Sequence, residues 1–183
     1  MERKPRSSGR DRKSKLTDSI ELKLNKLGLK IPSKLELPTT IRTPPTWIRI
    51  HRNIAYVSGH GPQNADGTIA GPFGKVDEEL DGAEISVDQA YNSAKLAGLS
   101  MLGSLKRELG SLDKVTAWLQ IRVMVNTVPG FSNTTAVADG FSDLILSIYG
   151  RPKGIHARSA IGVQALPLDL PVIVEGIVQI RNI

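Results

Sequence analysis

The chain has 183 residues, of which 40% are apolar, and its 24 Lys and Arg against 18 Asp and Glu give a net charge of +6. This size and apolar content indicate one globular domain. The absence of Cys excludes disulfides, thiolate nucleophiles, Cys-ligated zinc and iron–sulfur clusters. No apolar run approaches the roughly 18 residues of a membrane span, and the amino terminus lacks the apolar core of a secretory signal. We therefore expect a cytoplasmic protein.

The positive charge is concentrated at the amino terminus. Residues 1–16 hold seven basic and two acidic residues, a net charge of +5, which leaves +1 for the remaining 167 residues. This segment is polar and aperiodic, so we predict a disordered basic tail. Such a tail could bind RNA weakly through phosphates, but it lacks interleaved aromatic residues to stack on bases, and we favour a solubilising leader.

A short amphipathic helix and an extended connector are predicted for residues 17–46. Asp18 and Glu21 have the spacing of a capping box, and Gly28 can take the left-handed conformation that ends a helix. The apolar positions that repeat at helical spacing are Ile20, Leu24 and Leu27. Four prolines between residues 32 and 46 then exclude a helix from the connector.

Residues 47–183 are predicted to form the main domain. WIRI at 47–50 and IAYVSG at 54–59 are typical of two hairpin strands joined by a turn at 51–53. Residues 59–82 contain turn sequences and at most short strand pieces.

Two helices and three further strands follow. Ser86 and Gln89 form a capping box that begins a helix, and Gly110 should end it. A second helix is predicted at 134–149, and strands at 157–165 and 172–182. The buried side of the helix at 134–149 is predicted to consist of Val137, Phe141, Leu144 and Ile148, and Gly150 is expected to end this helix. A long strand lies between the helices at 115–127, with one apolar face made of Val115, Ala117, Leu119, Ile121, Val123 and Val125.

The element order β-β-α-β-α-β-β predicts an α+β fold in which both main helices pack on one face of a mixed sheet. The other face is left to solvent or to another subunit. Trp118, on that strand, is interpreted as a core or interface residue.

Two segments resemble the YjgF/RidA family, which is also described as the endoribonuclease L-PSP family. They are YVSGHGP at 56–62 and HARSAIGVQALPLDLPVIVEGIVQI at 156–180. The resemblance runs from about residue 18 to the end of the chain. Within the family, the chain more specifically resembles a longer bacterial subgroup that has an amino-terminal helix. It implies a chorismate-mutase-like fold, a homotrimer with ligand clefts between subunits, and hydrolysis of enamines or imines such as 2-aminoacrylate to a 2-oxo acid and ammonia, without metal or organic cofactor.

The resemblance also implies roles for residues of this chain. Arg158 is the expected clamp for the substrate carboxylate, since a guanidinium holds a carboxylate through two hydrogen bonds. The residues expected to line the cleft are Ser58, Gly59 and Ala160. Ile173 falls where hydrolytic members have the glutamate that orients the attacking water. Glu175 lies two residues further on the same strand face, so it is the candidate replacement.

Three further polar residues are candidates for the cleft. Asp139 falls at the family's helix asparagine and is a weak acid–base candidate, with a solvated aspartate as the alternative. His156 shares a strand face with Arg158 and either contacts substrate or packs at the strand's start. His60 replaces a usual glutamine and is either a cleft donor or a loop histidine. The three histidines form no dense ligand cluster, so no metal site is expected.

Three functions are therefore weighed. The leading hypothesis is a trimeric, cofactor-independent enamine/imine deaminase that acts on a small carboxylate-bearing metabolite. The alternative is a trimer that binds or senses a 2-oxo acid without turnover. An RNA-binding protein, endoribonuclease or translation inhibitor ranks last, because the sequence lacks a paired-histidine or metal arrangement for RNA cleavage.

Overall fold

The structure, a computed structural model, describes residues 19–37, 39–78 and 85–181. The predictions for the basic tail at 1–16, for Asp18 and for the end of the 59–82 loop concern residues outside these ranges. The strands are β1 (Ile48–His51), β2 (Ile54–His60), β3 (Val115–Asn126), β4 (Ala157–Val163) and β5 (Val172–Ile180). The helices are α2 (Ile20–Lys26), α3 (Val87–Leu109), α4 (Thr134–Tyr149) and α5 (Arg151–Gly154), with 3₁₀ turns at Leu112–Lys114 and Pro167–Asp169.

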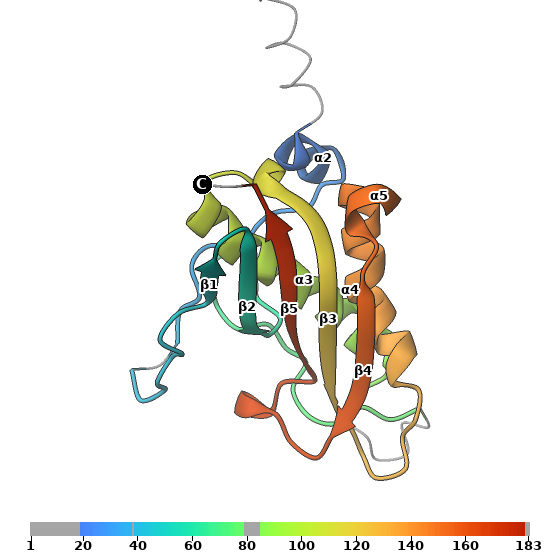
Figure 1. Cartoon of the computed structure of the whole chain (residues 1–183). Coiled ribbons are helices and arrows are strands. Elements are labelled where there is room, and N and C mark those ends of the chain that lie inside the picture. Colours follow the sequence, from blue (N-terminus) through green and yellow to red (C-terminus); the bar gives the residue numbers. More distant parts are fainter. Residues whose placement is uncertain (1–18, 38, 79–84, 182–183) are drawn as a thin grey trace, which may run out of the picture.

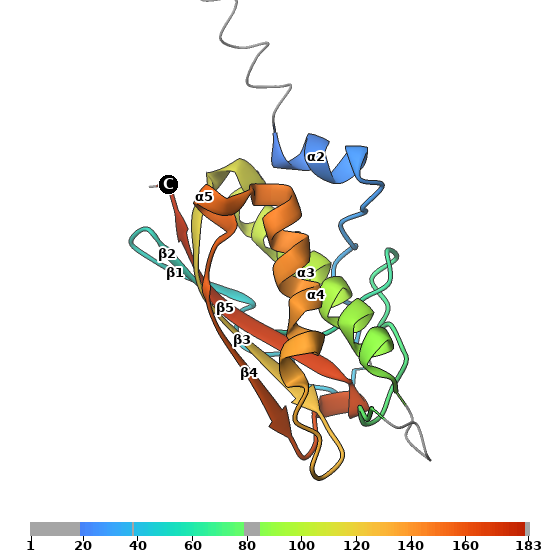
Figure 2. The same ribbon diagram turned by 90° about the vertical axis from the view of Figure 1, so that its right-hand side faces the viewer.

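The five strands form one mixed sheet in the order β1-β2-β5-β3-β4. All neighbours are antiparallel except β3 and β4, which are parallel because α4 and α5 carry the chain back between them. The two long helices, α3 and α4, lie side by side on one face of the sheet, and none of the described helices covers its other face (Figures 1 and 2). The predicted α+β fold, with helices on one face of a mixed sheet, is confirmed.

Local capping signals set both ends of the long helix α3. The Ser86 hydroxyl accepts from the Gln89 amide while the Gln89 side chain accepts from the Ser86 amide, which is the predicted capping box. Gly110 ends α3 with a φ of 79°, in the left-handed region that glycine adopts without strain.

The predicted cap of the first helix is wrong. Ser19 is its N-cap and accepts from the Leu22 amide at 3.2 Å. The Glu21 carboxylate accepts from the Leu112 amide at 3.0 Å. A tertiary contact with the turn after α3 therefore takes the place of the local capping box.

The core lies between the sheet and the helix pair, and α3 and α4 approach each other closely. A Cβ atom on Gly140 would lie 2.0 Å from the Tyr91 carbonyl oxygen, so backbone meets backbone at this position. Gly98 faces Leu144 in the same way, with 2.7 Å between its ideal Cβ position and the Leu144 Cδ2. The buried residues predicted for α4, namely Val137, Phe141, Leu144 and Ile148, all lie in this core.

The strict alternation predicted along β3 is broken. Leu119 was expected in the core but is 40% exposed, and the preceding Trp118 is buried instead. The pairing of β3 with β5 shifts register between Trp118 and Gln120, and a shift of one residue exchanges the two faces of a strand. Trp118 packs edge-on against Phe141 and Tyr149, with ring centroids 5.7 and 5.6 Å apart, as the core interpretation predicted.

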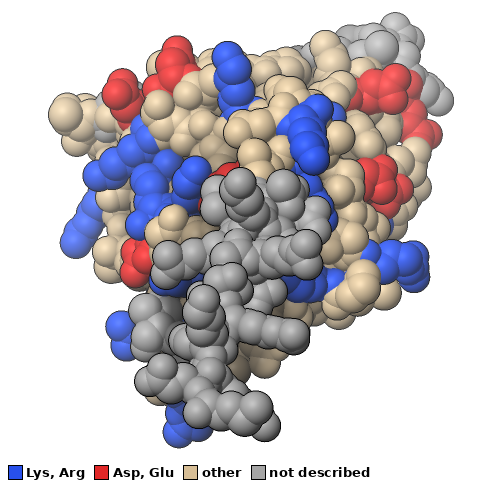
Figure 3. Space-filling model, turned by 90° about the horizontal axis from the view of Figure 1, so that it is seen from above, with Lys and Arg blue, Asp and Glu red and all other residues tan. Residues whose placement is uncertain are grey.

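The surface of the described body is mixed in charge. Seen from the end that carries α2, Lys and Arg side chains are interspersed with Asp and Glu side chains (Figure 3). None of the described helices is both long enough and apolar enough to cross a membrane.

Candidate functional site

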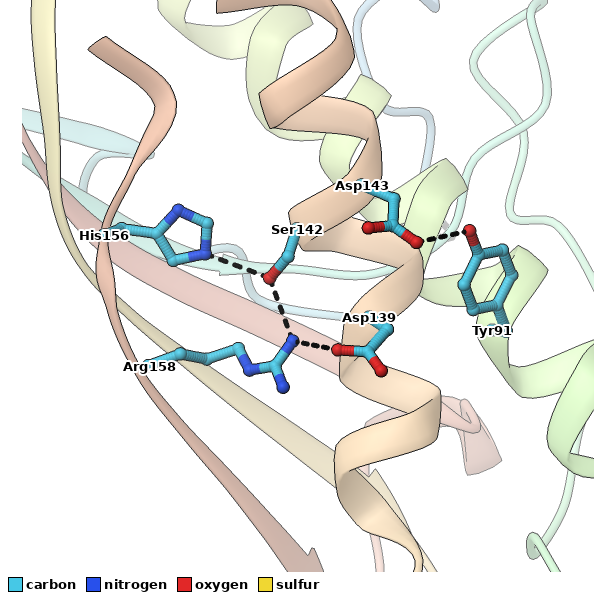
Figure 4. A network of polar contacts seen from close by, with 6 residues as sticks. All are labelled: Tyr91, Asp139, Ser142, Asp143, His156 and Arg158. Atoms are coloured by element: carbon cyan, nitrogen blue, oxygen red, sulfur yellow. Dashed lines mark hydrogen bonds and ion pairs between the residues drawn. The ribbon is translucent and has the colours of Figure 1, made fainter. Parts of the chain in front are cut away.

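Arg158 projects from the edge strand β4 toward α4, where two polar side chains hold its guanidinium (Figure 4). Its Nη1 donates to Asp139 Oδ1 at 2.8 Å and to Ser142 Oγ at 2.9 Å. Asp139 and Ser142 are three residues apart on α4 and so lie on one helix face. The Arg158 side chain is 21% exposed and the Asp139 side chain 53%, so the pair is open to solvent and to a ligand.

His156 completes this network behind the arginine (Figure 4). Its Nδ1 lies 2.7 Å from the Gly154 carbonyl oxygen, which can only accept, so Nδ1 carries the proton. Its Nε2 then accepts from the Ser142 hydroxyl at 3.0 Å. Burial, together with the nearby Arg158 charge, lowers the pKa of His156, although the bond to Gly154 opposes the shift. The ring is therefore neutral at pH 7, and Ser142 links it to Arg158.

Ser142 was not among the residues singled out from the sequence. The available signal was its position three residues after Asp139, which places both on one side of the helix. Asp143, next along α4, belongs to a different contact, because its Oδ2 accepts from the Tyr91 hydroxyl at 3.0 Å (Figure 4).

The residues of β2 lie far from Arg158 in the sheet, because β5 and β3 separate β2 from β4. Gly59 instead lies against Ile173 of β5, whose Cγ2 would be 2.8 Å from a Cβ on Gly59. Both line an apolar hollow of about 210 Å³ that also includes Trp47 and Leu170. Ser58 is half-buried beside this hollow, and Ala160 lies on the α4 side of β4, where its carbonyl accepts from Thr134.

One chain therefore holds two separate groups of the residues expected in the cleft. Asp139, His156, Arg158 and Ala160 lie together at the β4 edge, whereas Ser58, Gly59 and Ile173 lie together near β2.

His60 and Glu175 are each engaged elsewhere. His60 is only 4% exposed and turns toward α3, where its Nε2 accepts from Ser104 Oγ at 2.8 Å. Glu175 accepts from Arg122 Nη1 at 2.8 Å on the sheet face that carries no helix. Arg122 pairs in register with Ser159 of β4, so Arg158, one residue earlier, points to the opposite face.

The β4 edge thus offers a positioned guanidinium beside an exposed carboxylate. Within the described ranges no three His, Cys, Asp or Glu residues are grouped so that they could hold a metal ion. The available chemistry is the binding of a small anionic group by Arg158 and proton transfer by Asp139.

The fold and the β4-edge arginine define an α+β protein of the chorismate-mutase-like kind, and comparisons with known proteins support that class. No family model matches the chain. Protein TCP17 of Trypanosoma cruzi is 32% identical over 165 residues, which cover 89% of this chain and 95% of TCP17. The crystal structure of Atu1372 from Agrobacterium tumefaciens, a protein of unknown function, superposes with a TM-score of 0.74 at 32% identity, over 92% of this chain and 97% of that one.

Two further crystal structures share the fold. A candidate endoribonuclease from Shewanella oneidensis gives a TM-score of 0.75 at 22% identity, over 88% of this chain and 99% of that one. RidA from an Antarctic Psychrobacter gives a TM-score of 0.51 at 18% identity, over 82% of this chain and 98% of that one. The chain is therefore a relative of TCP17 and Atu1372 and has the fold of the YjgF/RidA family.

Proposed function

We propose that this protein is a cofactor-independent hydrolase of small, carboxylate-bearing enamines or imines, which releases a 2-oxo acid and ammonia in the cytoplasm. The observation that carries the proposal is the position of Arg158. It lies on an edge strand, is fixed by Asp139 and Ser142 through one nitrogen, and keeps part of its guanidinium exposed. A guanidinium has five N–H donors in a planar fork, so the exposed part can bind a carboxylate.

The separation of the two residue groups supports a cleft shared between subunits. The β4 edge supplies charge and the hollow near Gly59 and Ile173 supplies an apolar wall, but they lie on different parts of one sheet. In the proposed homotrimer, the β4 edge of one subunit meets the hollow near Gly59 and Ile173 of the next subunit. Each cleft would then hold the substrate carboxylate at Arg158 and its apolar part against Ile173.

Asp139 is the proposed acid–base group. A carboxylate bound to the exposed part of Arg158 lies beside Asp139, because the two side chains are 2.8 Å apart. An enamine first takes a proton from solvent on its terminal carbon and becomes an iminium ion. Water then adds to the iminium carbon, the C=N electron pair moves to nitrogen, and one proton of the water goes to Asp139, which leaves a neutral carbinolamine. Asp139 returns this proton to the amine nitrogen, the C–N bond breaks with its electron pair on the departing ammonia, and the hydroxyl oxygen forms the C=O bond of the 2-oxo acid as it releases its proton to solvent.

The second candidate function is binding of a 2-oxo acid without turnover. It is favoured by Ile173, which cannot orient a water, and by Glu175, whose carboxylate is already paired with Arg122. In this case Arg158 would still bind the carboxylate, and Asp139 would compete with the ligand for the guanidinium.

The test is hydrolysis of 2-aminoacrylate generated in situ, followed through pyruvate and ammonia. We expect Arg158→Gln to lower kcat/KM at least about tenfold, the loss expected when a charged hydrogen bond is removed. Asp139→Asn should lower kcat while pyruvate binds more tightly, because the guanidinium is freed. Arg49→Gln, an exposed arginine on β1, is the matched control and should match the wild type.

Two outcomes separate the candidates. Wild-type rates equal to those in buffer would reject the hydrolase. Saturable pyruvate binding that disappears in Arg158→Gln, without turnover, would establish the binding function instead.

A further inference from the structure

A cavity of about 660 Å³ lies beneath the connector, between it, the second half of α3 and the end of β2. It lies near β2, toward the edge of the sheet opposite to β4, because two strands separate β2 from β4. Four polar side chains that line it are almost fully buried, namely His60, Gln63, Ser100 and Ser104. An unused packing gap in a protein core is normally lined by apolar groups, so this composition points to a binding site.

The buried polar groups are fixed by hydrogen bonds among themselves. Ser100 donates to the Gln63 side chain, whose Nε2 donates to the Gly67 carbonyl at 3.2 Å. His60 Nδ1 lies 2.6 Å from the Ser58 carbonyl oxygen, so it carries the proton, and Nε2 accepts from Ser104. These groups form a rigid polar wall and need no ligand to satisfy them.

Arg107 differs from these residues because it is exposed and carries a charge. Its Nη2 donates to Ser104 Oγ at 3.1 Å and its Nη1 to the Pro32 carbonyl at 3.2 Å. Within residues 19–37, 39–78 and 85–181, no carboxylate lies within ion-pair distance of it, although Glu108 also lines the cavity. Partial burial lowers the pKa of Arg107, as expected for a cation that has lost part of its hydration.

The opposite wall comes from the connector and is mainly apolar. The apolar side chains that line it are Leu35, Leu37, Ile41, Pro44 and Trp47. Lys34 adds a second cation, so two positive charges and one negative charge line the cavity. A ligand that fits both walls has an anionic head and an apolar body.

We propose that this cavity binds a small organic acid, with its carboxylate on Arg107 and its apolar body against the connector, at a site separate from Arg158. The exposed N–H groups of the guanidinium can hold the carboxylate, and a volume of about 660 Å³ is within the range of small-molecule pockets. Its connector wall also lines the hollow near Gly59 and Ile173, but Arg107 does not, so the carboxylate contact proposed here is independent of the proposed hydrolase function.

The test is calorimetric titration of the full chain with 4-methylpentanoate and 3-phenylpropionate. We expect saturable binding of at least one of these acids, and binding at least about tenfold weaker for the matching neutral amides. Arg107→Gln should weaken acid binding to a similar extent. Lys106→Gln is the matched control, because Lys106 is exposed on the same helix and does not line the cavity.

Two more variants keep the test decisive. Ile41→Asp places a carboxylate on the connector wall, away from the α3 hydrogen bonds, and should repel the acid even if Arg107→Gln unfolds. Arg158→Gln should leave the affinity unchanged. Loss of binding in Arg158→Gln with retention in Arg107→Gln, or no saturable binding of either acid at millimolar concentration, would overturn the proposal.

Discussion

The protonation of His60 should control how stability depends on pH. This ring is 4% exposed and lies between the Ser58 carbonyl, Ser104 and the Trp47 ring, whose centroid is 5.1 Å away. Burial lowers the pKa of His60 from 6.5 to about 4, and the charge of Arg107 adds to the effect, while the bond to Ser58 opposes it. The perturbation we choose is His60→Gln, which removes the titration.

The direction of the effect follows from which state binds the proton. Between pH 6.5 and about 4 the unfolded chain has a protonated imidazole, whereas the folded chain does not. The contribution of the neutral His60 ring to the free energy of unfolding is therefore fully present above pH 6.5 and is lost as the pH falls toward 4. At about 1.4 kcal/mol per pH unit, the interval corresponds to a loss of about 3 kcal/mol.

The assay is urea denaturation at a series of pH values from 7 to 4, at one protein concentration because the chain is expected to associate. Wild-type protein should lose about 3 kcal/mol more than His60→Gln over this range. His156 is present in both proteins, so its own titration cancels in the difference. His51→Gln, at an exposed position on β1, should keep the wild-type profile. A wild-type and His60→Gln difference below about 1 kcal/mol would refute the reasoning, because the folded state would then accept the proton.

Three other predictions concern packing, surface charge and the site. Gly140→Ala should lower the free energy of unfolding by on the order of 3 kcal/mol in urea titrations, since its Cβ would meet the Tyr91 carbonyl; a neutral effect would show that α3 and α4 can separate. Arg122→Gln should change stability by less than about 1 kcal/mol, because both partners of the Arg122–Glu175 pair are exposed; a larger loss in the same titrations would contradict this. Ile173→Glu should raise 2-aminoacrylate turnover at least about tenfold if a water-orienting carboxylate is what the cleft lacks, and an unchanged rate of pyruvate release would count against that view.

Local signals in the sequence were sufficient for most helix and strand positions. The Ser86–Gln89 capping box and the Gly110 stop act through hydrogen bonds and backbone conformations within a few residues, so they are readable without the fold. The side chains of β3 were harder to place. Whether Trp118 or Leu119 enters the core depends on a register shift against β5, and β5 lies more than 50 residues further along the chain.

The same distinction applies to the candidate site. Arg158 and His156 are two residues apart in the sequence, so their proximity could be predicted, whereas their link through Ser142 depends on how α4 packs over β4. The family resemblance placed Ser58 and Gly59 with Arg158 in a cleft between subunits. The strand order, which no local signal gives, shows how far apart they lie within one chain.

The contact between Gly140 and the Tyr91 carbonyl gives neighbouring positions on α4 very different tolerance to mutation. Gly140 has no room for even one methyl group, whereas Asp139, the preceding residue, is about half exposed and can change chemical type without disturbing the core. The helix pair is therefore a fixed frame on which the residue facing Arg158 can be exchanged. A substitution at position 139 should therefore leave the packing of α3 against α4 intact and change only the polar partner of Arg158.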